Sequence, residues 1–171
     1  EKKLIEQHQT IMEDDMQFLL NDEEKTTYFC GTKSKSRNLF IPRSIKYNAQ
    51  EYLVTRIYDN STFDLIESIT IPSSVVKFED GWCKDVEKLI KFEVDPNNKH
   101  FINYKDEFIL GKTDENNDIF DVIIFARRDL EQATIPTFIK KINSYAFSRC
   151  NKLQSIEIPF KFECQTKLKM H

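Results

Sequence analysis

Two stretches of the chain repeat one another at a fixed offset of 64 residues. Each opens with a short segment that ends in Ile-Pro, at residues 71–72 and 135–136. Apolar residues then recur at matching positions, which are Val75, Phe78, Trp82, Cys83, Val86, Leu89, Phe92 and Val94 in the first stretch and Ile139, Ile142, Ala146, Phe147, Cys150, Leu153, Ile156 and Ile158 in the second. A repeat unit cannot bury its apolar face alone, so this agreement predicts a solenoid of stacked repeats.

The spacing of the short strands gives the length of one repeat. Each strand is expected to end at an apolar residue that proline usually follows, and these ends are Ile41, Ile71, Val94, Ile135 and Ile158. Successive ends are 30, 23, 41 and 23 residues apart. Because 23 occurs twice, we take it as the period and interpret the longer steps as repeats that carry insertions.

Apolar and polar residues alternate within each strand, which predicts one inward and one outward face. Ile71, Ile135 and Ile158 are placed inward, where a substituted aspartate should disrupt folding. Stacked in register, the outward residues would form one surface stripe of ten side chains. They are Asn38, Phe40, Ser68, Thr70, Lys91, Glu93, Gln132, Thr134, Ser155 and Glu157. Behind the strands, apolar residues at every third or fourth position predict short helical or 3₁₀ return segments.

The segment from Ile135 to Pro159, with its Ala146-Phe147 pair and Cys150, resembles the BspA-like leucine-rich repeat. The resemblance covers about residues 37–160. It implies an α/β repeat solenoid with short parallel strands. Relatives in this family are described as surface antigens or adhesins of anaerobic bacteria and flagellate protist parasites. The resemblance therefore implies a protein ligand, such as a host cell-surface or matrix protein, and a location at the cell surface.

The 41-residue step carries an insertion that resembles a hairpin often found in this family. Two apolar runs, Phe108–Gly111 and Asp121–Phe125, flank a segment rich in Asn and Asp from Lys112 to Asp118. This order predicts two strands and a hairpin loop within about residues 101–128. In the preceding repeat Trp82-Cys83 replaces the expected Ala-Phe pair, so Gly81 and Cys83 are expected to make room for the indole.

Residues 1–24 are predicted to form an amphipathic N-terminal helix, because apolar residues recur at helical spacing without Gly or Pro. This helix either caps the first repeat or continues a coiled coil from upstream sequence. The solenoid is then assigned to residues 25–160, and residues 161–171 are expected to be a tail or a truncated repeat.

Composition excludes several kinds of chemistry. With 3 glycines, all isolated, no glycine-rich phosphate loop can be written, and no cofactor is expected. The 3 histidines share no ligand spacing, so no metal site is expected either. A net charge of −3 without a basic block argues against nucleic-acid binding, and no apolar run is long enough for membrane insertion. The cysteines show no C-x-x-C spacing and are interpreted as buried free thiols: Cys30, Cys83, Cys150 and Cys164.

These patterns predict a non-catalytic protein-interaction module, not an enzyme. Two settings stay open. The resemblance implies a surface antigen or adhesin, whereas the charged N-terminal segment and unpaired cysteines favour a cytoplasmic scaffold or regulatory repeat region of a larger signalling protein such as a kinase. The outward stripe is the expected binding surface, with Phe40 as its anchor. Lys112 and Phe120 of the insertion form a second candidate contact zone.

Overall fold

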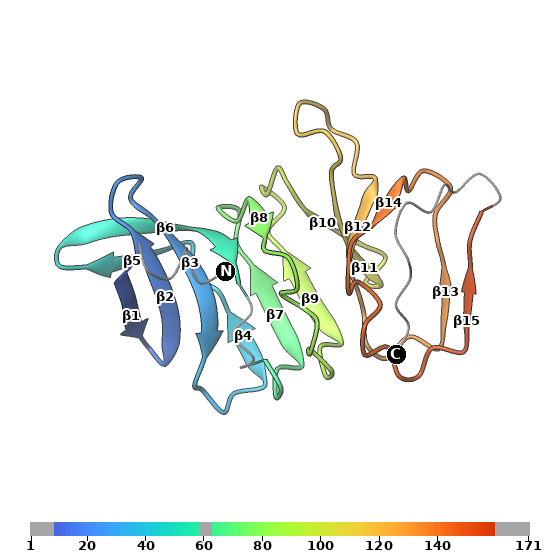
Figure 1. The fold of residues 1–171 in the computed structure, drawn as a ribbon, viewed down its shortest axis with the longest axis horizontal. Helices are drawn as coiled ribbons and strands as arrows, with labels where there is room; N and C mark the ends of the chain where they lie inside the picture. Colours follow the sequence, from blue (N-terminus) through green and yellow to red (C-terminus); the bar gives the residue numbers. More distant parts are fainter. Residues whose placement is uncertain (1–8, 59–62, 160–171) are drawn as a thin grey trace.

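The computed structural model describes residues 9–58 and 63–159, and this part of the chain forms an elongated stack of strands without a helix (Figure 1). The strands are β1 (Gln9–Glu13), β2 (Met16–Asn21), β3 (Thr26–Thr32), β4 (Asn38–Phe40), β5 (Ser44–Tyr47), β6 (Gln50–Ile57), β7 (Ser68–Ile71), β8 (Lys77–Phe78), β9 (Lys91–Val94), β10 (Ile102–Tyr104), β11 (Phe108–Gly111), β12 (Val122–Ala126), β13 (Gln132–Thr134), β14 (Lys141–Ile142) and β15 (Ser155–Glu157). The predicted repeat solenoid is confirmed. The α/β class is wrong for the described residues, because strands and turns alone build them.

Three repeats contribute parallel strands to a front sheet. β4, β7 and β9 pair in register, so that Leu39, Ile69 and Phe92 lie side by side. All three side chains are buried, as alternation along a strand requires. The inward positions of Ile71 and Ile135 are also confirmed, since both residues are buried.

The offset of 64 residues appears as direct contact between two turns. The hydroxyl of Ser148 donates to the carbonyl of Lys84 at 2.9 Å, and Arg149 forms an ion pair with Asp85 at 3.2 Å. The members of both pairs are 64 residues apart. The two repeats therefore stack on each other although an insertion separates them in sequence.

Residues 9–21 form a hairpin in place of the predicted N-terminal helix. β1 pairs antiparallel with β2 across Asp14 and Asp15, whose φ angles are 46° and 61°. A two-residue turn with both φ angles positive fits the twist of a hairpin, and aspartate tolerates this conformation better than most residues. β2 pairs with β3, and β3 runs parallel to β6, so strands extend the back of the solenoid here. Residues 1–8 of the predicted helix lie outside the described residues.

The return segments contain isolated turns and two-residue strands where helical turns were predicted. Single turns close when Val75 donates to Pro72 and Ile139 donates to Pro136. Each segment then pairs with the preceding repeat: β8 with β6, and β14 with β12. These bonds satisfy the backbone groups that a helix would otherwise have to pair internally.

The insertion contains the two expected strands and one more. β11 and β12 pair antiparallel across residues 112–121, while β10 adds to β11 and β14 adds to β12. Asp121 is buried at the base of the connecting loop. Thr113 donates to its carboxylate from the backbone N–H and from the hydroxyl, and Nζ of Lys140 lies 2.9 Å away.

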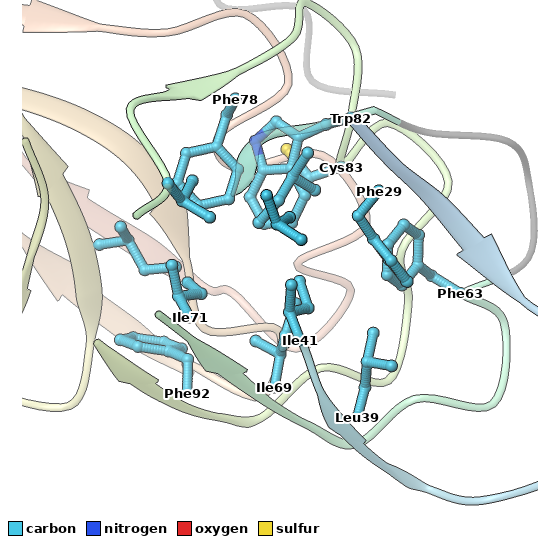
Figure 2. Packing of buried hydrophobic residues seen from close by; sticks show 14 of the residues in the cluster. Phe29, Leu39, Ile41, Phe63, Ile69, Ile71, Phe78, Trp82, Cys83 and Phe92 are labelled. Carbon is cyan, nitrogen blue, oxygen red and sulfur yellow. The ribbon is translucent and has the colours of Figure 1, made fainter. Parts of the chain in front are cut away.

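Aromatic rings fill the core beside the front sheet (Figure 2). The indole of Trp82 packs with Phe78 and Phe125, at ring-centroid distances of 4.5 and 5.4 Å. Gly81 is not what makes room for the indole, because a Cβ added there would meet no atom within 4 Å. Gly81 has a φ of 80°, and its equivalent Tyr145 has a φ of 64°, so the position carries a left-handed turn in both repeats.

Arg128 is a buried cation that joins two return segments. Its Nε donates to the carbonyl of Val86 at 2.8 Å, and Nη2 donates to Cys83 at 2.9 Å. Nη1 donates to the carbonyls of Ala126 and Ala146 at 3.1 and 2.7 Å. The planar guanidinium can make these bonds at once because its donors have a fixed fork geometry.

The last described repeat is less buried than the earlier ones. Leu153 and Ile156 are half-buried, and Ile158 is 41% exposed, so Ile158 lacks the burial that was predicted for it. Within the described residues no further repeat packs on its outer side. The predicted C-terminal segment 161–171 lies outside them.

Cys30 and Cys150 are free thiols within the fold. Cys30 and Cys83 are buried, and Cys150 is half-buried. Burial raises the pKa of Cys30 to about 12, which keeps this thiol protonated and unreactive. Cys164 lies outside the described residues.

Replacing Asp121 with asparagine should reduce the sensitivity of the fold to acid. Burial opposes ionisation of Asp121, but hydrogen bonds from Lys140 and Thr113 outweigh it and hold its pKa below the ordinary 3.8. A lowered pKa contributes stability above the unfolded-state pKa, and this contribution is lost as pH falls through the folded-state pKa. Asp121→Asn should lower the free energy of unfolding at neutral pH by about 1–3 kcal/mol and flatten its fall in acid, measured by urea denaturation. Asp118→Asn, at a fully exposed carboxylate, is the control, and equal acid slopes for the two variants would contradict the prediction.

Candidate interaction surface

The front sheet gathers six of the ten predicted outward residues into one patch. The register of β4, β7 and β9 aligns two rows across the three strands. We call these residues the front patch: Asn38, Phe40, Ser68, Thr70, Lys91 and Glu93. Ser68 and Thr70 are half-buried and the other four are exposed. Phe40, at 69% exposure, is the large apolar side chain in this patch.

The polar members of the front patch are held by local contacts. The hydroxyl of Ser68 lies 2.6 Å from Oδ1 of Asn38 on the adjacent strand. Lys91 and Glu93 form an ion pair at 3.7 Å, with side chains 71% and 64% exposed. An exposed pair of this kind contributes little to stability, so both charges are available to a partner.

The remaining four residues form a second patch on β13 and β15. It consists of Gln132, Thr134, Ser155 and Glu157. β13 and β15 pair parallel, which places Gln132 beside Ser155 and Thr134 beside Glu157. All four side chains are exposed, and the hydroxyl of Thr134 lies 3.3 Å from Oε2 of Glu157. None is apolar, so this patch has no anchor of the type found at binding hot spots.

The two patches do not form the single stripe that strand periodicity predicted. The front sheet ends at β9, and β13 pairs with β15 in a separate sheet. At the outer edge of β9, Nδ2 of Asn103 donates to the carbonyl of Phe92 at 3.1 Å. A side chain of the insertion thus occupies a hydrogen-bonding position that the next strand would use. The 41-residue step between the strand ends Val94 and Ile135 predicted an insertion. It did not predict that the insertion separates the front sheet from the sheet of β13 and β15.

The second predicted contact zone is not accessible as expected. The side chain of Lys112 is only 5% exposed, and its Nζ donates to the carbonyl of Asn117 at 2.7 Å and lies 4.8 Å from the ring centroid of Phe120. Phe120 is half-buried against the core of the insertion. Lys112 therefore supports the loop, and the exposed apolar residue nearby is Ile119.

An aromatic pair that was not predicted lies on the surface. The rings of Tyr104 and Phe138 meet edge to face, with centroids 5.6 Å apart. Phe138 is 45% exposed, and Nζ of Lys105 lies 5.4 Å from the Tyr104 centroid. The two aromatic residues are far apart in sequence and Tyr104 lies on the unpredicted strand β10, so no sequence pattern indicated their contact.

A groove of about 390 Å³ lies between β8 and β14, and Glu79 is one of its lining residues. Glu79 in this groove pairs with Arg56 and with Lys77, each at 2.9 Å. Burial opposes ionisation of Glu79, yet hydrogen bonds from these two cations outweigh it and lower its pKa. A carboxylate tied to two cations with a lowered pKa is a poor general acid or base at neutral pH.

Within residues 9–58 and 63–159, no group of three or more His, Cys, Asp and Glu side chains could hold a metal ion. His100 there pairs with Glu115 at 2.7 Å. The described residues also include no helix of the length and apolar character that crosses a bilayer.

Comparisons with known proteins agree with the fold. Residues 118–167 match a family model described as the BspA type leucine rich repeat region (6 copies). A leucine rich cell surface protein from Faecalibacterium prausnitzii is 16% identical with a TM-score of 0.53, over 90% of this chain and 44% of that chain. A leucine-rich repeat protein from Bacteroides ovatus is 16% identical with a TM-score of 0.57, over 90% and 42%. The pneumococcal vaccine antigen PcpA is 16% identical with a TM-score of 0.51, over 92% and 40%.

At these identities the three structures show a shared fold alone. The chain spans less than half of the length of each of them. No curated protein sequence matches the chain.

Proposed function

Because the chain carries BspA-type leucine-rich repeats over residues 118–167, we propose that it is a non-catalytic module that binds a protein ligand through the front patch. Repeat solenoids present regular, extended surfaces to other proteins, and proteins with these repeats act as interaction modules. The observation that carries the proposal is the 69% exposure of Phe40 on β4, which pairs in register with β7, as β7 does with β9. A rigid sheet that presents an aromatic anchor loses little conformational entropy on binding.

The proposed ligand is a host cell-surface or matrix protein, and the proposed role is that of a surface antigen or adhesin. The descriptions of two proteins that share the fold support this part of the proposal. One is described as a cell surface protein, and the other as a pneumococcal vaccine antigen. The front patch adds a charged pair and hydrogen-bonding side chains around its aromatic anchor, which suits a polar protein surface.

An intracellular scaffold or regulatory region of a larger signalling protein is the alternative. The free thiols Cys30 and Cys150 favour it, since cysteines persist unpaired in reducing compartments. Labelling of intact cells with a membrane-impermeant reagent distinguishes the two settings. Labelled protein supports the surface role, and protein that is labelled only after lysis supports the alternative.

Phe40→Ala should weaken binding to a matrix ligand by about tenfold or more, because truncation of an aromatic anchor commonly costs over 1 kcal/mol. Binding of the full chain to immobilised fibronectin, laminin and collagen, followed by biolayer interferometry, provides the measurement. Phe138→Ala is the matched control, since Phe138 is an exposed phenylalanine outside the front patch. Unchanged affinity of Phe40→Ala, or no binding of the folded wild type to any of these proteins, would argue against the proposed ligand class.

A further inference from the structure

The front sheet has an open edge at β4. In the order of its strands β4 comes first, and among the described residues it pairs with β7 alone. The back of the solenoid continues past this point, because β6 pairs with β3 and β3 with β2. The front sheet therefore stops before the back does, with β4 as its edge strand (Figure 1).

The register shows which backbone groups of β4 face outward. Ser68 donates to the carbonyl of Arg37, and Ile41 donates to the carbonyl of Thr70. Residues 37, 39 and 41 therefore direct their hydrogen-bonding groups toward β7. Because successive residues of a strand point these groups to opposite sides, those of Asn38 and Phe40 face the open edge.

The two outward-facing residues differ in how their backbone groups are used. The hydroxyl of Ser36 accepts from the N–H of Asn38 at 3.1 Å and donates to its carbonyl at 2.9 Å. This single side chain closes the edge at Asn38. Within the described residues, no hydrogen bond reaches the N–H or the carbonyl of Phe40. Phe40 therefore presents an unbonded N–H, an unbonded carbonyl and an exposed ring at the same position of the edge.

The chain entering this edge is basic. Lys33, Lys35 and Arg37 are exposed and lie in the seven residues before Phe40, which include no acidic residue. Arg37 is paired with Glu67 at 2.8 Å, while no ion pair in the described part of the chain includes Lys33 or Lys35. The edge thus offers an unbalanced positive charge to an approaching segment.

We propose that the β4 edge binds an extended, acidic peptide segment of a partner protein, which adds a strand to the front sheet beside Phe40. In strand addition, main-chain hydrogen bonds supply affinity and alternate side chains supply specificity. Here the ring of Phe40 would contact an apolar residue of the added segment, and Lys33 and Lys35 would face its carboxylates. This proposal rests on the proposed function, because it names the chemistry of the ligand and its mode of binding at the same face.

A second copy of the chain is a poorer occupant of the same edge. Two copies that met through β4 would both bring the unbalanced positive charge of Lys33 and Lys35 to one interface. Like charges at an interface disfavour association, and natural edge strands use lysine to prevent such pairing. The charges that attract an acidic segment therefore repel another β4.

The probe is a fluorescein-labelled peptide of alternating valine and glutamate, with blocked ends, titrated with the full chain and followed by fluorescence polarisation. The expected result is saturable binding that weakens with added salt. Two altered peptides serve as controls: one has lysine in place of glutamate, and the other carries N-methyl groups on the amides of both edges. Both should bind about tenfold more weakly or not at all, because one loses charge complementarity and the other loses backbone donors.

Two substitutions in the chain test the edge itself. Phe40→Pro removes the outward N–H but no bond to β7, so it should bind the peptide more weakly than Phe40→Ala, which keeps that N–H. Ser36→Ala opens the edge at Asn38 and should tighten binding severalfold, a gain that misfolding cannot produce. Circular dichroism confirms that each variant is folded.

Three results would overturn the inference. They are equal binding of the N-methylated peptide, equal affinities of Phe40→Pro and Phe40→Ala, and a concentration-dependent dimer that Phe40→Pro abolishes. The proposed function fails separately, when Phe40→Ala leaves binding to the matrix ligand unchanged. The two failures are therefore distinguishable.

Discussion

Replacing Ile71 with aspartate should unfold the protein at room temperature. Ile71 is fully buried in the largest hydrophobic cluster of the described residues, between the front sheet and the aromatic rings behind it. A carboxylate placed there has no cation to pair with. It must either take up a proton, although water favours the ionised form, or stay ionised and let water into the core. The expected loss is about 4 kcal/mol or more, which approaches the whole stability of a domain of this size. Circular dichroism and thermal melts provide the measurement.

The same substitution at two other positions provides matched controls. Ser68→Asp places the charge on the outward face opposite Lys91 and should change the free energy of unfolding by less than about 1 kcal/mol. Ile158→Asp should also be mild, because Ile158 is 41% exposed. If Ser68→Asp or Ile158→Asp were as damaging as Ile71→Asp, the assignment of inward and outward faces would be wrong.

Arg128→Met should lower the free energy of unfolding by about 3–5 kcal/mol. The substitution keeps a long side chain but removes the donors to the carbonyls of Cys83, Val86, Ala126 and Ala146. Each buried acceptor that loses a donor costs about 1–3 kcal/mol, and some of this is recovered when the buried charge disappears. For a chain of this length the melting temperature should fall by about 10 °C.

Arg127→Met is the neighbouring control for this prediction. Arg127 is half-buried and pairs with Asp129 at 2.6 Å, near the surface. Its loss should cost about 1 kcal/mol or less. Arg128→Lys should fall between the two, because one ammonium cannot reach acceptors in both return segments. Equal melting temperatures for Arg127→Met and Arg128→Met would show that the guanidinium does not join the repeats.

The stacking of the repeats could be predicted from the sequence because the same side-chain pattern must occur wherever one repeat covers another. Ile71 and Ile135 are 64 residues apart and both are buried. The pairs Ser148–Lys84 and Arg149–Asp85 show that this offset brings equivalent turns together. The outward residues of β4, β7 and β9 followed from the same alternation.

The N-terminal hairpin was not predictable in this way. Ile11 and Phe18 are seven residues apart, which fits two turns of a helix, yet they are also direct partners across β1 and β2. A pattern of so few apolar residues is thus compatible with a helix and with a hairpin. The decisive feature is the left-handed turn at Asp14 and Asp15, which favours the hairpin once the strands can pair with β3.

The division of the binding face and the role of Arg128 depend on contacts that sequence periodicity does not record. Asn103 reaches the carbonyl of Phe92, and Arg128 reaches acceptors up to 45 residues away in sequence. Each contact joins a residue of the insertion to a residue of an earlier repeat. A pattern within one repeat predicts the shape of that repeat, but not which long side chain will bond to its neighbours.

Because turns 64 residues apart are in direct contact, the hairpin of β11 and β12 is not needed to set the distance between the repeats. Since Ser148 already bonds to Lys84, the length of chain that departs after β9 and returns before β13 does not set the pitch of the stack. The loop between β11 and β12 is consequently a graft site. Foreign peptides inserted at its exposed tip, at residues 114–116, would be displayed on the surface, while the repeats on both sides keep their register.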